Sequence, residues 1–428
     1  NVTAITATAT AGNGVGMIAA SGNDATDGAA GTTGSAADKL NGGAGGAGGN
    51  GSNGSTMHDA IAQSNNGADA KADALTTTGG RLNVVSDSGL MIAAKAENAA
   101  ETNTANAVAA DNSDNVYSVK GDFTVKATAT GDVNSADYAV PNGNATWIGY
   151  KAAATNTLTN ATGFAINGGS MIAEVDGKFT VEAKAGEGET KNFSQGMAVD
   201  NATVKVHATG AIDIKAAAEK ASDTKNQIAQ GIEGNNNNLT FVSDAGGIKV
   251  TALGGDGTGI NKEYSVWTYD STVTLDAKDS AEGIVLNGDV EVITKRTETS
   301  ILNLKSTTKV NSTTTDGGHS AGALNISGTT MNLTDNLTTL TVADKTTLAG
   351  SSVYFFDDKN QEDKYNGTDY RSITTKDLAA TGTNEFFMRT NANGVYGQST
   401  GNDKIASANT ATGGGTYNIT VFDQGMRN

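Results

Sequence analysis

The chain has 428 residues and a formal net charge of −17, and 55 of its residues are glycine, one is proline and none is cysteine. Binding to nucleic acid or to an anionic membrane needs clustered cations, so only 29 lysine and arginine residues in so acidic a chain argue against both partners. The absence of cysteine excludes a disulfide scaffold and thiolate metal sites.

Threonine, valine, glycine and asparagine are abundant, and this composition predicts short β-strands joined by tight turns. Charged residues make up 18% of the chain, too few for a solvated disordered protein. A single proline suits a chain whose backbone N–H groups are nearly all paired in β-ladders. We therefore expect an all-β protein with little helix.

The N-terminal region combines a strand-like start with a glycine-rich stretch. Residues 1–20 are expected to form the first turns of the β structure. Residues 21–78 include a low-complexity run at 41–51 with almost nothing to bury, so they are expected to form a Gly/Asn/Ala-rich loop excursion. The flanking phrases Val15-Gly-Met-Ile-Ala-Ala and Gly89-Leu-Met-Ile-Ala-Ala are alike, so the same structure should resume after the excursion.

Residues 79–300 carry an internal repeat, which is typical of a solenoid. Related phrases begin at Gly163, Gly196, Gly231 and Ser265, so the units are 33, 35 and 34 residues apart, or about 34. Two runs in each unit alternate apolar and polar residues, which is the period of a β-strand. No unit is long enough to close a core of its own, so stacked coils bearing loops are favoured over separate β-sandwich domains.

A second phrase recurs at residues 121–127, 177–183, 210–216 and 247–252. Its alternate apolar residues should point inward and stack on those of the next coil. The positions expected inside the rod, from this phrase and from the neighbouring strands, are Phe123, Val125, Phe179, Val181, Val204, Val206, Ile212, Ile214, Ile248, Val250, Val273, Leu275, Val290 and Val292.

The C-terminal part contains two segments whose sequence patterns differ from the repeat and from each other. Residues 301–383 carry short leucine-containing strands in quick succession, which predicts compact coils. Residues 384–428 then carry the most specific signal of the chain, which consists of Glu385-Phe-Phe-Met-Arg-Thr-Asn, Gly401-Asn-Asp-Lys-Ile and Ala411-Thr-Gly-Gly-Gly-Thr-Tyr-Asn-Ile-Thr-Val-Phe-Asp-Gln-Gly.

This segment resembles the autochaperone segment that ends the passenger domains of pertactin-type autotransporters. That family's pattern is an aromatic-led strand, an Asp-Lys-hydrophobic strand, a glycine-containing turn and an alternating strand that ends near a glycine. Residues 385–425 reproduce the four features in order, although the family usually has an acidic residue where this chain has Thr390-Asn391-Ala392. The autochaperone-like positions are Phe386, Phe387, Asp403, Lys404, Ile405, Tyr417, Ile419 and Val421.

The resemblance implies a right-handed parallel β-helix (β-solenoid) that is secreted through an outer-membrane β-barrel not present in this chain. Such a passenger is expected to be extracellular, on the bacterial outer-membrane surface, and to act as a structural or adhesive rod. Its partners would be glycans or proteins on a host or bacterial surface. Open ladder ends would also let copies of the rod associate end to end or laterally into filaments.

An enzyme on the same fold is the alternative function. Ser86-Asp87-Ser88-Gly89 is similar to the nucleophile loop of serine-protease passengers, and Asp357, Asp358, Glu362 and Asp363 could form the paired carboxylates of a polysaccharide-cleaving site. A turn between strands explains the serine phrase better, and lysine and asparagine surround the carboxylates. We therefore assign no catalytic residue and expect no enzyme.

Metal and ligand sites are indicated weakly. Asp111, Asp114 and Asp256 lie in oxygen-rich turns that calcium could use, but neither turn matches a full ligand loop, and no other cofactor is expected. The three histidines lack metal-ligand spacing, and His207 is expected to face solvent.

Aromatic residues gather at one place in the repeat region. Tyr264, Trp267 and Tyr269 could form a platform for a glycan if they were exposed. Trp267 is instead expected to fill the rod where alanine leaves space.

Overall fold

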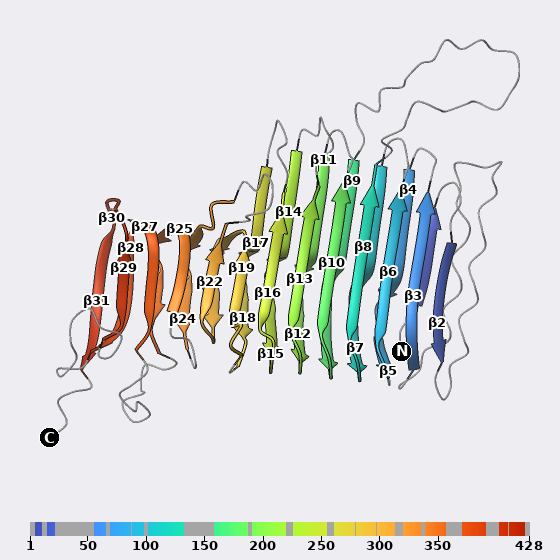
Figure 1. Cartoon of the computed structure of the whole chain (residues 1–428), viewed down its shortest axis with the longest axis horizontal. Helices are drawn as coiled ribbons and strands as arrows, with labels where there is room; N and C mark the ends of the chain where they lie inside the picture. The colour runs from blue at the N-terminus through green and yellow to red at the C-terminus, as the bar shows by residue number, and fades with distance from the viewer. Residues whose placement is uncertain are drawn as a thin grey trace, which may run out of the picture.

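The computed structural model of the protein describes residues 5–10, 15–21, 55–65, 69–86, 88–97, 102–131, 158–186, 191–219, 226–254, 261–278, 280–296, 298–312, 320–334, 339–356, 370–390, 402–409 and 411–423. These residues form strands and turns, and none of them is helical. Among them, accordingly, there is no helix long and apolar enough to cross a membrane. The strands lie side by side along one axis, with the N-terminal strands at one end and the C-terminal strands at the other (Figure 1).

The strands form three columns, A, B and C, in which each strand pairs in parallel with the equivalent strand of the next coil. Column A contains β4 (Asp69–Thr78), the first parts of β7 (Thr102–Val119) and β9 (Leu158–Val175), β11 (Lys191–Asp200), β14 (Asn226–Asn235), β17 (Asn261–Tyr269), β20 (Asp289–Ile293), β23 (Leu324–Ser327), the second parts of β25 (Thr339–Ala349) and β27 (Ser372–Thr381), and β30 (Ala411–Thr412).

Column B contains β5 (Arg81–Ser86), the second parts of β7 and β9, β12 (Thr203–Ala208), β15 (Asn238–Ser243), β18 (Thr272–Asp276), β21 (Ile301–Leu304), β24 (Thr330–Leu333), β26 (Ser352–Tyr354), β28 (Thr383–Thr390) and β31 (Thr416–Asp423). Column C contains β3 (Ser55–Asn65), β6 (Leu90–Glu97), β8 (Phe123–Thr130), β10 (Phe179–Gly186), β13 (Ile212–Ala218), β16 (Ile248–Leu253), β19 (Ile284–Asn287), β22 (Thr308–Asn311), the first parts of β25 and β27, and β29 (Lys404–Ser407). The all-β parallel solenoid expected from the sequence is thus confirmed.

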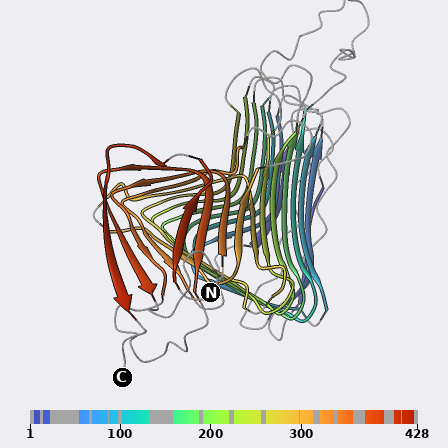
Figure 2. The same cartoon turned by 60° about the vertical axis from the view of Figure 1, so that its left-hand side comes forward.

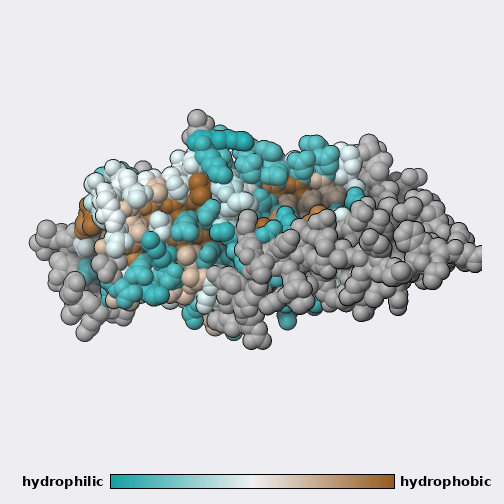
Figure 3. Space-filling model, turned by 90° about the horizontal axis from the view of Figure 1, so that it is seen from above, coloured by the Kyte–Doolittle hydropathy of each residue, from teal (hydrophilic) through white to brown (hydrophobic). Residues whose placement is uncertain are grey.

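Side chains alternate between the interior and the surface along these strands. In β12, Val204 and Val206 are buried, whereas Lys205 between them is exposed. All fourteen positions expected inside the rod are buried, with no more than 1% of any of them exposed. The main interior cluster runs from Ala72 to Phe386, and a small second cluster in the coils of residues 212–253 consists of Ala216, Ala218, Ala229 and Ala252. On the coloured surface seen from above, hydrophobic residues accordingly appear only in areas interrupted by hydrophilic ones (Figure 3).

The starts of the sequence repeats lie opposite one another in neighbouring coils. Gly196 is opposite Gly163 on one side and Gly231 on the other. At this point β11 turns two consecutive residues, Gly196 and Met197, towards the interior. A Cβ atom on Gly196 would lie 2.6 Å from the carbonyl oxygen of Gly231 and 2.6 Å from Cγ2 of Ile214. The repeat begins with a very small residue because the bent strand packs directly on its neighbours.

A thin arm extends the coils drawn from blue to yellow-green beyond the body of the rod (Figure 2). It consists of the first halves of the long column A strands packed on the ends of the column C strands. Ser194 of β11 donates a hydrogen bond to the carbonyl oxygen of Ala183 (2.8 Å) and accepts one from the N–H of Ala217 (3.1 Å). Small side chains let the two sheets approach this closely. The buried alanines of the arm include Ala72, Ala94, Ala96, Ala105, Ala127, Ala129, Ala161, Ala183, Ala185, Ala216, Ala218, Ala229 and Ala252.

The corner between columns A and B is a stack of tight turns. Asn112, Asn201, Asn236 and Asp270 occupy this corner in their coils with φ angles of 47°, 52°, 58° and 47°. Asparagine and aspartate tolerate this left-handed conformation better than most residues. The recurring Asn and Asp residues between the repeat phrases therefore mark the turns.

A ladder of buried polar side chains follows these turns. The N–H of Ala202 donates to Oδ1 of Asn237 (3.0 Å), the N–H of Asn237 to Oγ of Ser271 (3.2 Å), and the N–H of Ser271 to Oγ of Ser300 (3.3 Å). Each side chain thus satisfies a backbone donor of the preceding coil, which would be costly to bury unpaired. The ladder ties neighbouring coils together and fixes their register.

The C-terminal coils are shorter than the preceding ones. On column C, the paired residues Ile212, Ile248 and Ile284 are 36 residues apart, whereas Ile284 and Thr308 are separated by only 24. These coils lack the arm (Figure 2). The autochaperone-like segment continues the same three columns through β28 to β31, so it forms the last coil described.

The expectation of a loop over residues 21–78 is wrong for residues 55–65 and 69–78, which form strands. β3 and β4 lie within it, and they pair antiparallel with β2 (Val15–Ser21) and β1 (Ile5–Thr10), respectively. Ala72 and Ala74 of β4 are fully buried. Low hydrophobicity did not indicate a loop here, because small side chains suit a narrow interior; residues 22–54 lie outside the described residues.

Candidate functional site

Three aromatic side chains lie together on the outer face of β17. Tyr264, Trp267 and Tyr269 are partly exposed, whereas Ser265 and Val266 point inward and are fully buried. The expectation that Trp267 fills the interior is therefore wrong. Two consecutive inward residues shift the alternation of the strand, as in a β-bulge, and this shift brings Tyr264 and Trp267 to the same face.

The aromatic cluster is held by contacts on several sides. The rings of Tyr264 and Trp267 stack with centroids 5.6 Å apart, and Trp267 meets Tyr269 edge to face at 5.0 Å. Nε1 of Trp267 donates a 2.9 Å hydrogen bond to Oε1 of Glu291 in the next coil. Nζ of Lys295 lies 3.2 Å from the centroid of the Tyr269 ring, a cation–π contact. These contacts fix the orientation of the rings.

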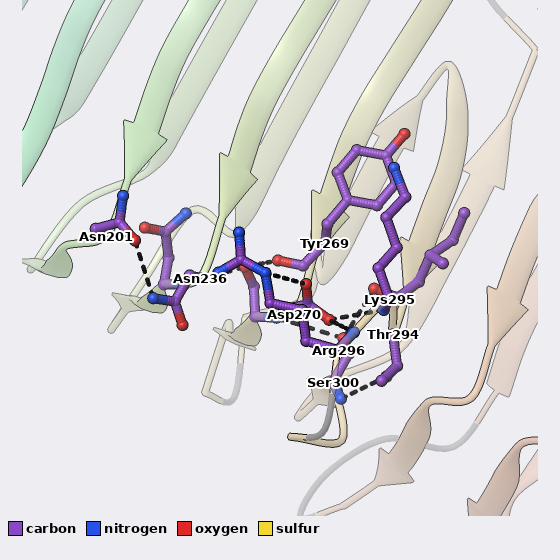
Figure 4. Close-up of polar contacts among 11 residues, drawn as sticks. Asn201, Asn236, Tyr269, Asp270, Thr294, Lys295, Arg296 and Ser300 are labelled. Atoms are coloured by element: carbon purple, nitrogen blue, oxygen red, sulfur yellow. Dashed lines mark hydrogen bonds and ion pairs between the residues drawn. The ribbon is translucent and has the colours of Figure 1, made fainter.

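A hollow of about 360 Å³ borders Tyr269 at the corner between columns A and B. Four of its lining residues, Tyr269, Asp270, Lys295 and Arg296, are labelled in Figure 4. Its walls come from three successive coils and from the segment that follows β20. The lining residues are Asp200, Glu233, Asn235, Tyr269, Asp270, Lys295 and Arg296.

Asp270 holds the cationic side of the hollow in place. Its side chain is 4% exposed, and its Oδ1 accepts hydrogen bonds from the N–H groups of Lys295 (2.7 Å) and Arg296 (2.8 Å). Nε of Arg296 lies 3.7 Å from Oδ2. The backbone at Lys295 and Arg296 is thereby fixed by a carboxylate from the coil before it (Figure 4).

The ends of the segment from Thr294 to Ser300 are pinned as well. The N–H of Ser300 donates to Oγ1 of Thr294 (2.8 Å), and this hydroxyl donates to the carbonyl oxygen of Gly328 in the following coil (2.7 Å). Thr294 stands where the preceding coils have a left-handed Asn or Asp. The departure from the repeated turn lets a short loop project beside Tyr269.

A second hollow of about 320 Å³ lies along the turns of the same corner. Asn201, Asn236 and Glu298 line it, and Asp270 borders both hollows. Nδ2 of Asn236 donates to Oδ1 of Asn201 at 2.9 Å, so the asparagines are ordered by each other. The corner therefore presents a row of amide and hydroxyl groups beside the first hollow.

Charge in the first hollow is tuned by burial. Burial raises the pKa of Glu233 to about 7, and the nearby charge of Asp200 adds to the rise. Burial also raises the pKa of Tyr269 to about 12, with a further contribution from Glu291. Near neutral pH, the Glu233 carboxyl group can therefore donate or accept a hydrogen bond. The site therefore offers hydrogen-bond donors and hydrogen-bond acceptors beside an aromatic ring.

A histidine bridges three coils on column B. Nδ1 of His207 lies 2.8 Å from Oε2 of Glu174, and Nε2 lies 2.9 Å from Oδ2 of Asp244. The side chain is 41% exposed, so the expected outward position is as observed. The hydrogen bond with Asp244 raises the pKa of His207 above 6.5; burial acts in the opposite direction, and Glu174 adds to the rise.

We expect His207→Gln to destabilise the protein at pH 6 more than at pH 9. Because the folded-state pKa of His207 lies above its ordinary value of 6.5, its stabilisation is fully present below pH 6.5 and is lost as pH rises through the folded-state value. Thermal unfolding of the wild type and the variant across this pH range measures the difference. Lys205→Gln, on the same outer face of β12, is the control for loss of a cation. Equal destabilisation by His207→Gln at pH 6 and at pH 9 would contradict the prediction.

The candidate serine nucleophile lies in a turn. Ser86 is fully buried and donates to the carbonyl oxygen of Gly89 at 3.0 Å, a contact within a turn. Asp357, Asp358, Glu362 and Asp363 lie outside the described residues.

Two of the three calcium candidates lie within the described residues. Asp111 accepts a hydrogen bond from Asn167, and Asp114 accepts one from Ser170. Asp256 lies outside the described residues, and within those residues no group of three or more His, Cys, Asp or Glu could hold a metal ion.

The autochaperone-like residues divide between the interior and the surface. Phe386 and Asp403 are buried, and the Phe387 ring stacks on Tyr354 with centroids 4.1 Å apart. Lys404 is exposed and Ile405 is partly buried. Three apolar positions of β31 are exposed, namely Tyr417, Ile419 and Val421.

The fold defines the protein as a parallel β-solenoid with a side arm. The chain matches no protein-family model, no curated protein and no solved structure. Its functional interpretation therefore depends on the residues and the geometry described above.

Proposed function

We propose that the protein is an extracellular rod of the autotransporter-passenger kind, with a structural or adhesive function on the bacterial outer-membrane surface. The observation that carries this proposal is the main interior cluster from Ala72 to Phe386, which makes the described coils one continuous body. A solenoid of this type presents an extended surface for binding, because each coil adds its own outer groups to the same face.

Secretion is supported by the sequence of the last coil. Residues 385–425 carry the four features of an autochaperone segment, and Phe386 and Asp403 of that segment are buried. The expected partners are glycans or proteins on a host or bacterial surface, which the corner with its hollows would contact.

Adhesion can be measured with the purified protein coupled to fluorescent beads. We expect saturable binding to epithelial or Gram-negative bacterial cells, and competition by excess soluble protein. Because the chain has a net charge of −17, beads coated with polyglutamate are the appropriate control. Binding that does not saturate, or that polyglutamate beads reproduce, would exclude specific adhesion.

Self-association is a second candidate, favoured by the apolar side of β31. Ile419 is 60% exposed and Val421 is 53% exposed, although Ile419 pairs with the position of Phe386, which is only 2% exposed. In the described part of the chain, β31 pairs only with β28. The corresponding edge and apolar positions could accept a strand of a second copy.

We expect the protein to form larger species as its concentration rises, and Ile419→Lys to prevent this growth by placing a charge on the contact face. Sedimentation velocity with electron microscopy measures both effects. Asn418→Lys adds the same charge to the opposite face of β31 and should leave assembly intact. Wild-type rods of one size at every concentration would count against self-association.

A further inference from the structure

The hollow beside Tyr269 combines an aromatic wall with polar groups of both charges. One face of the Tyr269 ring is covered by Nζ of Lys295, 3.2 Å from the ring centroid, and the ring also lines the hollow. Its neighbour Trp267 packs against the ring edge to face and does not line the hollow. A ligand would thus meet a single ring whose position is already set by its neighbours.

The polar walls can pair with groups that both donate and accept hydrogen bonds. Asp200 and Glu233 provide carboxyl oxygens on one side, and Lys295 and Arg296 provide cationic donors on the other. The amide of Asn235 can do both. Hydroxyl groups also donate and accept, so a ligand rich in hydroxyls can use every wall of this hollow.

The balance of charges disfavours a charged ligand. An anion would approach Lys295 and Arg296 but would also face Asp200 and Glu233, and a cation would meet the reverse arrangement. Asp270 is already committed to the Lys295 and Arg296 backbone, so it adds no open carboxylate. An uncharged molecule avoids both repulsions.

We propose that this hollow binds an uncharged sugar residue of a glycan, with the Tyr269 ring against the apolar face of the sugar and the surrounding polar groups bonded to its hydroxyls. Its volume of about 360 Å³ lies at the lower end of the range for ligand pockets, about 300–1,000 Å³, which suits one or two sugar rings. The inference rests on the proposed adhesive function and names the ligand class for it.

The row of turns beside the hollow supports the same ligand class. The second hollow shares Asp270 with the first and is lined by the ordered side chains of Asn201 and Asn236. Amide groups suit further hydroxyls, so a sugar chain bound at Tyr269 can continue along the corner. Binding should therefore strengthen from a monosaccharide to a short oligosaccharide.

The test is a titration of the purified full chain with maltohexaose, cellohexaose, xylohexaose and N-acetylchitohexaose, followed by calorimetry and saturation-transfer NMR. Polygalacturonate and chitosan oligomers are the charged comparison. We expect saturable binding of at least one neutral oligosaccharide and weaker binding of both charged ones. Tyr269→Ala should weaken that binding at least tenfold.

Tyr417→Ala is the matched control, because it removes the same kind of side chain from an exposed position of β31 that does not line the hollow. It should change the affinity less than twofold, with circular dichroism confirming that both variants are folded. Should Tyr269→Ala fail to fold, Asp200→Ala replaces it, with the same tenfold loss expected.

Three results would overturn the proposed site: no binding of any neutral oligosaccharide, tighter binding of a charged one, or equal losses for Tyr417→Ala and Tyr269→Ala. These outcomes differ from a failure of the adhesive function, because the titration uses free sugars. Sugar binding without adhesion to cells would overturn only the adhesive function, and adhesion without sugar binding would overturn only this site.

Discussion

Asp403→Asn is expected to lower the free energy of unfolding by about 3–5 kcal/mol, the usual cost of breaking a buried ion pair from one side. The Asp403 side chain is 0% exposed and that of Arg389 is 6% exposed. The two carboxylate oxygens accept from Nε and Nη2 of Arg389 at 2.9 Å each, and Oδ1 also accepts the N–H of Arg371 at 2.9 Å. Asparagine would turn one acceptor into a donor and leave the guanidinium charge buried without its partner.

Urea unfolding followed by circular dichroism measures this loss. Lys404→Ala is the control, because it changes the adjacent residue of the same segment at an exposed position. The control should stay within about 0.5 kcal/mol of the wild type. If Asp403→Asn were no more destabilising than Lys404→Ala, the pair would not hold the last coil in place.

Gly196→Ala is expected to cost about 1–3 kcal/mol, because an added methyl group would overpack the interior. Its Cβ would lie 2.6 Å both from a backbone oxygen of Gly231 and from Cγ2 of Ile214, and neither atom is the end of a flexible chain. Alanine does occupy the equivalent place in two earlier coils, as Ala74 and Ala107. The cost thus comes from these particular neighbours and not from the backbone conformation.

Gly186→Ala provides the comparison for this substitution. The nearest atom to its added Cβ would be Cβ of Glu219 at 3.5 Å, an ordinary contact. We expect it to be neutral or stabilising by up to about 1 kcal/mol, since alanine restricts the unfolded chain. Thermal unfolding of both variants measures the contrast, and equal midpoints would show that the small-residue column at Gly196 does not limit packing.

The interior of the rod could be predicted from the sequence because each repeat phrase contains its own strands and turns. Val204 and Val206, or Ile212 and Ile214, alternate with polar residues within a few positions, and this local pattern alone assigns them to the core. The resemblance at residues 385–425 also lies in local phrases. Properties that arise within one coil are therefore visible in the sequence.

The candidate site was only partly predictable, because its parts come from different coils. The aromatic residues stand out in the sequence, but the inward pair Ser265 and Val266 shifts the alternation and turns Trp267 outward. The bonds from Asp270 reach residues 25 and 26 positions later, and no short pattern indicates them. Each repeat begins with two consecutive inward residues, of which the first is small, as in Gly196-Met197 and Ser265-Val266. This pair is the signal in the sequence that could have shown which residues face outward.

In the coils that carry the thin arm, the variation in connection length lies at one edge of the molecule. The connections from column C back to column A differ widely, because β8 and β9 end and begin at Thr130 and Leu158, whereas β10 and β11 do so at Gly186 and Lys191. Yet β10 pairs residue for residue with β8, from Phe179 on Phe123 to Gly186 on Thr130. Insertions and deletions at this edge leave the register of neighbouring coils unchanged. The loops at this edge can therefore change in length and sequence during evolution while the strands that carry them stay the same.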